Sequence, residues 1–105
     1  MRPPIFADYK GDLCVFESVA AAERYIEPID AQNRECSVFD ADGRILAVLP
    51  DAPTTKITAP EPPQFDADHL AECLRRFLAA VGHSVAELSM PLPRLVELAR
   101  AHGGR

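Results

Sequence analysis

Residues 36–49 read CSVFDADGRILAVL and contain the strongest local signal in the chain. Two apolar runs, Cys36–Phe39 and Ile45–Leu49, flank the polar segment Asp40–Arg44. Asp42 and Gly43 tolerate the positive φ values of the mirror-image turns that join antiparallel strands. The stretch therefore predicts a β-hairpin.

A similar pattern precedes it. Ile5–Ala7 lead into Tyr9-Lys10-Gly11-Asp12, and Leu13–Phe16 lead out. Gly11 supplies the conformational freedom that a tight turn needs. Apolar residues alternate onto both faces of the segment 13–16, so we expect the second strand of this hairpin to be interior to the sheet.

A short helix is predicted between the hairpins. Ser18 is a suitable N-cap for a helix of about nine residues, and Pro28 disfavours helix at Glu27. Apolar residues recur at helical spacing and predict a buried stripe: Val19, Ala22, Ile26 and Ile29.

The composition changes after the second hairpin. Five prolines fall between positions 50 and 63, and they exclude helix there. We expect residues 50–65 to form an extended connection, in which residues 55–58 could still make a short edge strand.

Residues 66–102 predict a helical part. Asp66 is the expected cap of a helix that ends at Gly82, and Ser84 and Glu87 form a capping-box pattern before a short helix. A last helix follows Pro91 and Pro93. The expected fold class is α+β: a small antiparallel sheet from two hairpins packed with one short helix (1–49), the connection (50–65) and the helical part (66–102), all in a single domain over residues 1–105.

The charge is unevenly distributed. The 105 residues have a net charge of −5. Residues 1–68 hold 13 acidic and 6 basic side chains, whereas residues 69–105 hold 3 and 5. An acidic surface repels nucleic acid and attracts basic proteins, so we expect no nucleic-acid partner. The sequence also lacks an apolar run long enough for a signal peptide or a membrane span, and it indicates a cytoplasmic protein with free thiols and no membrane partner.

No constellation typical of catalysis is present. Cys14 and Cys36 fall in apolar strands, where a thiol is buried and inert. His69 and Cys73 share a helix face at i, i+4 spacing, but two ligands do not make a zinc site. We therefore predict no catalytic, cofactor-binding or metal-binding residues, and no enzyme activity.

The spacing of carboxylates around the first predicted helix is unusual for a solvent-exposed helix face. Glu23 and Glu27 are four residues apart and Asp30 follows, at a spacing where like charges repel. They suit a ridge that meets a basic partner. The acidic field would extend further if the hairpin turns lie on the same side, through Asp8, Asp12, Glu17, Asp40 and Asp42. The predicted partner-binding residues are Glu23, Glu27, Asp30, Asp12, Asp40 and Asp42.

The segments 11–30 and 38–44 together resemble small bacterial immunity proteins of contact-dependent inhibition and other polymorphic toxin systems. The resemblance covers residues 5–49 and rests on turn glycines, a helix cap and core positions. It implies a cytosolic protein that neutralises a toxin's C-terminal domain, often a basic nuclease, by stoichiometric masking. The alternative is a small adaptor or regulatory domain that binds through its C-terminal helices, which exposure of Leu92, Leu95 and Val96 in the monomer would favour. The oligomeric state is left open.

Overall fold

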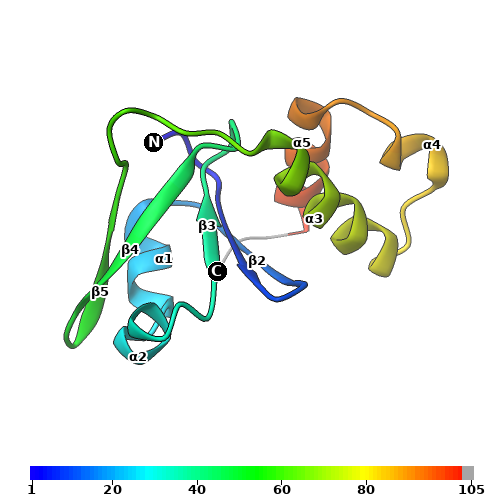
Figure 1. The fold of residues 1–105 in the computed structure, drawn as a ribbon. Helices are drawn as coiled ribbons and strands as arrows, with labels where there is room; N and C mark the ends of the chain where they lie inside the picture. Colours follow the sequence, from blue (N-terminus) through cyan, green and yellow to red (C-terminus); the bar gives the residue numbers. More distant parts are fainter. Residues whose placement is uncertain (103–105) are drawn as a thin grey trace.

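The computed structural model describes residues 1–102 and has an α+β fold (Figure 1). Its strands form one antiparallel sheet in the order β2-β1-β3-β4-β5. The strands are β1 (Ile5–Tyr9), β2 (Asp12–Phe16), β3 (Ser37–Phe39), β4 (Ile45–Asp51) and β5 (Thr54–Thr58). The helices are α1 (Val19–Tyr25), α2 (Pro28–Gln32), α3 (Ala67–Ala80), α4 (Val85–Leu88) and α5 (Leu92–Ala101).

Both predicted hairpins form, but the expected place of β2 in the sheet is wrong. β2 pairs with β1 alone and is an edge strand. Both faces of β2 are apolar because helices cover both sides of the sheet, and not because β2 lies between two strands. Leu13 and Val15 pack into one core cluster, and Cys14 and Phe16 pack into the other.

The segment between the hairpins forms two helices rather than one. The Ser18 side chain accepts a hydrogen bond from the backbone N–H of Ala21, which confirms the predicted cap. α1 ends at Tyr25, and Pro28 then occupies the first turn of α2, where its missing N–H is harmless. The break rotates Ile29 out of the predicted stripe, so the residue is 53% exposed instead of buried.

The possible edge strand at residues 55–58 forms as β5 (Thr54–Thr58), but the rest of the proline-rich segment differs from the expectation. β4 continues through Pro50 to Asp51, and β5 pairs with it in the register Pro50↔Thr55. β3 pairs only with Ile45 and Leu46 of β4, so residues 47–51 have β5 as their single neighbouring strand, and Pro50 removes no bond from a segment that is paired on both sides. The extended connection is therefore confined to residues 59–66, before α3.

The helical part follows the sequence closely. Asp66 caps α3 through the N–H of His69, and Gly82 has a φ of +97° just after the helix ends. Ser84 and Glu87 form the predicted capping box of α4. None of the helices within residues 1–102 is long and apolar enough to cross a bilayer.

Two apolar layers lie on opposite sides of the sheet. Phe6, Leu13, Val15 and Phe39 pack against α3 and α5. Ile5, Ala7, Cys14 and Phe16, with residues of β3–β5, pack against α1. Figure 1 shows α3–α5 on one side of β1–β3 and α1 and α2 on the other, next to β4 and β5. The alternation of β1 and β2 thus supplies both layers.

Gly43 fixes the contact between the second hairpin and α3. Its φ is +81°, and a Cβ built there would lie 2.8 Å from Ala67 Cα. Its carbonyl accepts a hydrogen bond from the N–H of Asp66. We expect Gly43→Ala to lower the free energy of unfolding by about 2 kcal/mol or more, because backbone strain and a backbone clash coincide.

Gly82→Ala is the matched control. Gly82 has a similar φ of +97°, but no atom lies within 4 Å of the position that a Cβ would take there. Only the conformational cost remains, about 1 kcal/mol. Urea denaturation of both variants measures the difference, and equal losses would mean that the Gly43–Ala67 contact yields without cost.

Candidate functional site

An open pocket lies between the first hairpin and the α1–α2 segment. Its volume is about 350 Å³. Six residues line it: Tyr9, Asp12, Cys14, Tyr25, Glu27 and Asp30. Three of these are predicted partner-binding carboxylates, contributed by β2, the α1–α2 link and α2.

Local structure explains how these groups meet. Tyr9 and Asp12 are paired opposite each other at the end of the β1–β2 hairpin. The Tyr25 ring packs on Phe16 at 5.3 Å between centroids and is 43% exposed. The turn at Pro28 then directs Glu27 and Asp30 to the same pocket. Two aromatic rings and three carboxylates therefore surround one space.

The phenol of Tyr9, which lines the pocket, and the thiol of Cys36, which contacts that phenol, are neutral at physiological pH. Burial is the main cause that raises the pKa of the Tyr9 phenol, and contact with Cys36 adds to it. Burial likewise raises the pKa of the Cys36 thiol. Cys36 is half-buried at the margin of the core, whereas its strand pattern predicted full burial. The charge of the pocket thus comes from its carboxylates.

Glu23 does not join the other predicted residues. Its carboxylate accepts a hydrogen bond of 2.8 Å from the N–H of Ile57, and its carbonyl accepts one of 3.1 Å from the Thr55 hydroxyl. Glu23 thereby ties α1 to the edge strand β5. The expected ridge is split, with Glu27 and Asp30 in the pocket and Glu23 on the sheet edge.

Asp40 and Asp42 lie at the opposite end of the sheet from Asp12. The β1–β2 turn follows Tyr9, whereas the β3–β4 turn follows Phe39, which pairs with Phe6 near the start of β1. The two turns therefore do not extend one field. Asp40 is 3% exposed, and its carboxylate accepts hydrogen bonds from the backbone N–H groups of Arg2, Asp42 and Arg44. Asp42 pairs with Arg2, which lowers the pKa of the Asp42 carboxyl.

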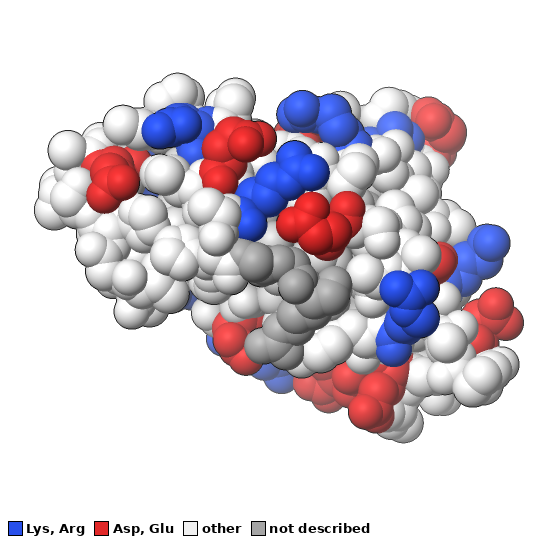
Figure 2. Space-filling model, turned by 180° about the vertical axis from the view of Figure 1, so that it is seen from behind, with Lys and Arg blue, Asp and Glu red and all other residues white. Residues whose placement is uncertain are grey.

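The surface view agrees with an acidic end of the molecule. Several Asp and Glu side chains adjoin one another at the lower right of the face in Figure 2, with Lys or Arg side chains beside them, and this is the corner where α2 lies in Figure 1. Acidic and basic side chains alternate along the upper edge. Local clustering of carboxylates, more than the net charge, distinguishes the lower right corner.

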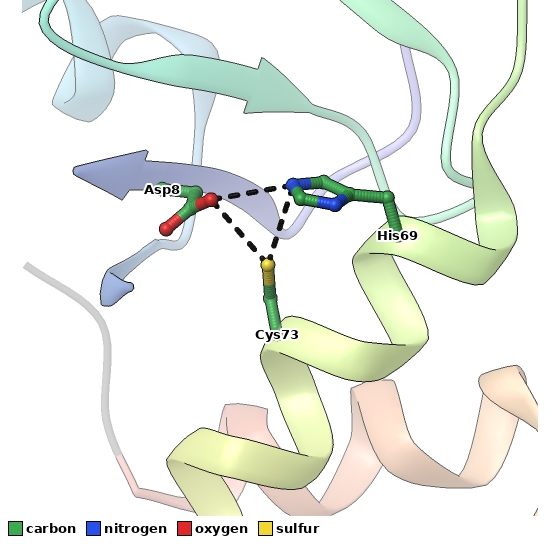
Figure 3. A group of neighbouring side chains, drawn as sticks. All are labelled: Asp8, His69 and Cys73. Atoms are coloured by element: carbon green, nitrogen blue, oxygen red, sulfur yellow. Dashed lines mark hydrogen bonds and ion pairs between the residues drawn. The ribbon is translucent and has the colours of Figure 1, made fainter. Parts of the chain in front are cut away.

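A second cluster joins β1 to α3. Asp8 Oδ2 lies 3.3 Å from His69 Nε2 and 3.5 Å from Cys73 Sγ, and the last two atoms are 3.6 Å apart (Figure 3). Asp8 and Cys73 are buried, and His69 is exposed. The sequence predicted that His69 and Cys73 share a face, but it did not predict Asp8 beside them. Side chains alternate along a strand, so Asp8 lies on the same face of β1 as Phe6. This position predicts a contact with His69 and Cys73 only once α3 is known to cover that face.

This cluster differs from a Cys–His–Asp nucleophile. In such a triad, one imidazole nitrogen contacts the nucleophile and the other contacts the orienting carboxylate. Here the same nitrogen, Nε2, faces both the thiol and the carboxylate. Burial, helped by Asp8, raises the pKa of the Cys73 thiol to about 11, so the nucleophilic thiolate is scarce at neutral pH.

The three residues whose exposure would favour the adaptor hypothesis are buried or partly buried, although Val81 and Val85 nearby are 45% and 80% exposed. Leu95 and Val96 are 0% and 4% exposed, and Leu92 packs partly buried against the same cluster. They belong to the core beneath α3. Within residues 1–102, the acidic pocket and the Asp8–His69–Cys73 cluster are the stronger candidates for function.

Comparisons with known proteins provide no further guidance. No family model, no curated protein and no solved structure matches the chain.

Proposed function

We propose that the chain is a protein-binding inhibitor of the immunity type, which neutralises a toxin's C-terminal domain by covering a basic surface. The observation that carries the proposal is the convergence of Asp12, Glu27 and Asp30 on one pocket beside two tyrosines. In this proposal, a Lys or Arg side chain of the partner enters the pocket.

The chemistry of the pocket suits a cationic side chain. Carboxylates accept charge-assisted hydrogen bonds from a guanidinium or ammonium group, and these are about twice as strong as neutral ones. The face of a tyrosine ring attracts the same cation. A volume of about 350 Å³ accommodates one long side chain with its solvent. Tyr25, which is partly exposed and packed on Phe16, supplies such an aromatic surface on the rim.

The uneven charge of the chain supports rapid capture. Residues 1–68 carry most of the acidic excess, and the pocket belongs to this part. A complementary field raises the association rate constant more than it slows dissociation, and salt screens it. We expect the association rate with a basic toxin domain to fall steeply as salt is added, which stopped-flow or surface plasmon resonance would measure.

The decisive experiment combines co-expression with matched charge variants. The full chain is tagged and co-expressed with the product of the adjacent upstream gene, and both growth rescue and stoichiometric capture are scored. The triple variant Asp12→Asn, Glu27→Gln, Asp30→Asn is expected to bind at least about 100-fold more weakly, because the partner's cation then enters an uncharged pocket.

A control triple variant removes the same charge elsewhere. Asp51→Asn, Asp68→Asn and Glu97→Gln alter carboxylates that do not line the pocket. We expect this variant to bind almost as tightly as the parent chain. Equal weakening in both variants would reduce the role of the pocket to general charge, and capture of no toxin domain would remove the immunity proposal.

A further inference from the structure

We infer that Asp8, His69 and Cys73 form a binding site for a divalent transition-metal ion of the zinc type, with three protein ligands and one open position. This inference is independent of the proposed toxin inhibition, because it concerns the β1–α3 junction and not the acidic pocket.

The distances between the donor atoms match tetrahedral coordination. Zinc binds thiolate sulfur at about 2.3 Å and imidazole nitrogen or carboxylate oxygen at about 2.0–2.2 Å. At tetrahedral angles these bond lengths separate sulfur from nitrogen or oxygen by about 3.6 Å, and nitrogen from oxygen by about 3.3 Å. The structure has 3.6, 3.5 and 3.3 Å for the corresponding pairs. One ion can therefore reach all three atoms with little rearrangement.

The three ligands are held in place by the fold. His69 and Cys73 are one turn apart on α3, and Cys73 is part of the core packed against the sheet. The Asp8 side chain is 11% exposed, and its second oxygen, Oδ1, accepts a hydrogen bond of 2.7 Å from the N–H of Gly11. Such a bond from outside the ligand set orients a coordinating carboxylate and leaves Oδ2 for the metal. The His69 ring also packs against Phe39, at 5.6 Å between centroids.

In the metal-free chain, each of the three contacts can be an ordinary hydrogen bond. Hydrogen bonding alone does not require each of the three donor atoms to contact both of the others. A thiol and an imidazole that share one carboxylate oxygen need not also approach each other. Here each of the three donor atoms contacts both others, as Figure 3 shows. On metal binding, the thiol proton is released to solvent and the sulfur lone pair forms the new bond.

Two of the three proposed ligands adjoin a cavity that is open to solvent. Asp8 and His69 line a cavity of about 310 Å³ together with Lys10 and residues 34–37. The His69 side chain is 44% exposed, so an ion can enter from this side. Three protein ligands with a free fourth position are typical of sites where the metal holds water or an exchangeable ligand, whereas purely structural zinc sites are closed by four. Thiolate, imidazole and carboxylate together favour zinc over magnesium or calcium.

Cobalt(II) titration of the full, reduced chain provides a direct test. We expect one equivalent of Co²⁺ to give the visible bands of tetrahedral cobalt and a near-ultraviolet thiolate-to-cobalt charge-transfer band, both abolished by one equivalent of Zn²⁺. Cys73→Ser should lose the charge-transfer band, and His69→Asn and Asp8→Asn should each weaken binding at least about 10-fold. Circular dichroism of the metal-free variants verifies that they are folded.

Two controls separate this site from other thiols and histidines. Cys14→Ala removes a buried thiol from the opposite core layer. His83→Gln removes one member of the other histidine pair, in which the Nε2 atoms of His83 and His102 are 2.6 Å apart. Both variants should retain the cobalt spectrum and affinity. Absence of a charge-transfer band in the parent chain, or its persistence in Cys73→Ser, would overturn the inference.

Discussion

Phe6→Ala is expected to lower the free energy of unfolding by about 4 kcal/mol, which removes much of the stability of a domain of this size. The side chain is completely buried. In the sheet, Phe6 lies opposite Val15 of β2 and Phe39 of β3, in the layer that packs against α3 and α5. Truncation loses its transfer free energy and leaves a cavity where the two halves of the fold meet.

Phe65→Ala makes the same chemical change on the surface. Phe65 is 58% exposed and lies in the connection before α3. We expect its truncation to change stability by no more than about 0.5 kcal/mol. Urea denaturation with matched m-values measures both variants. A loss below about 1 kcal/mol for Phe6→Ala would mean that the helical part does not pack on this face of the sheet.

The local elements of the fold could be predicted because their signals are short-range. The β3–β4 turn and the caps at Ser18 and Asp66 depend on groups within four residues of one another, although Gly43 alone, and not Asp42, takes the positive φ of the expected mirror-image turn. The capping box of Ser84 and Glu87 has the same character. Such interactions are fixed by covalent neighbours, so the sequence contains nearly all the information.

Strand order could not be predicted in this way. The apolar residues on both faces of β2 show that both faces are buried. They do not show whether β2 has one neighbouring strand or two, because helices can cover both faces of a strand at the centre or at the edge of a sheet. The structure has helices on both sides, and β2 is at the edge. Similarly, the proline at position 50 does not exclude a strand, because this part of β4 pairs with β5 alone and not with β3.

In the candidate sites, too, the residues that are neighbours in sequence could be predicted, and those brought in from other elements could not. Charge spacing identified Glu27 and Asp30, and the turn placed Asp12 beside them through a tertiary contact. Helical spacing identified His69 and Cys73 as neighbours, but the third donor comes from a strand 61 residues earlier than His69. The spacing of residues within one helix does not predict which residue of another element packs beside it. Sequence reasoning therefore found two of the three donor residues and rejected the site for lack of a third.

Asp40→Ala is expected to cost about 3 kcal/mol of stability without any partner present. The carboxylate is buried and accepts three backbone hydrogen bonds, of 3.1 Å from Arg2, 2.9 Å from Asp42 and 3.0 Å from Arg44. Hydrogen bonds to a charged acceptor each contribute about 1.5–3 kcal/mol, and part of the loss is recovered when water reaches the freed N–H groups. The residue thus closes the β3–β4 turn and fastens the N-terminal segment to it.

Two comparisons distinguish this structural role from the surface role that the sequence indicated. Asp40→Asn keeps one carbonyl oxygen, which can still accept hydrogen bonds from the backbone N–H groups of Asp42 and Arg44. Its amide NH₂ group would face the backbone N–H of Arg2, so that one hydrogen bond is lost. We therefore expect Asp40→Asn to lose roughly half as much stability as Asp40→Ala. Asp42→Ala removes an exposed partner of Arg2 and should leave the urea midpoint nearly unchanged. If Asp40→Ala were as stable as Asp42→Ala, the buried carboxylate would not hold the turn. If Asp40→Ala instead weakened binding of the proposed partner at unchanged stability, Asp40 would belong to the binding surface after all.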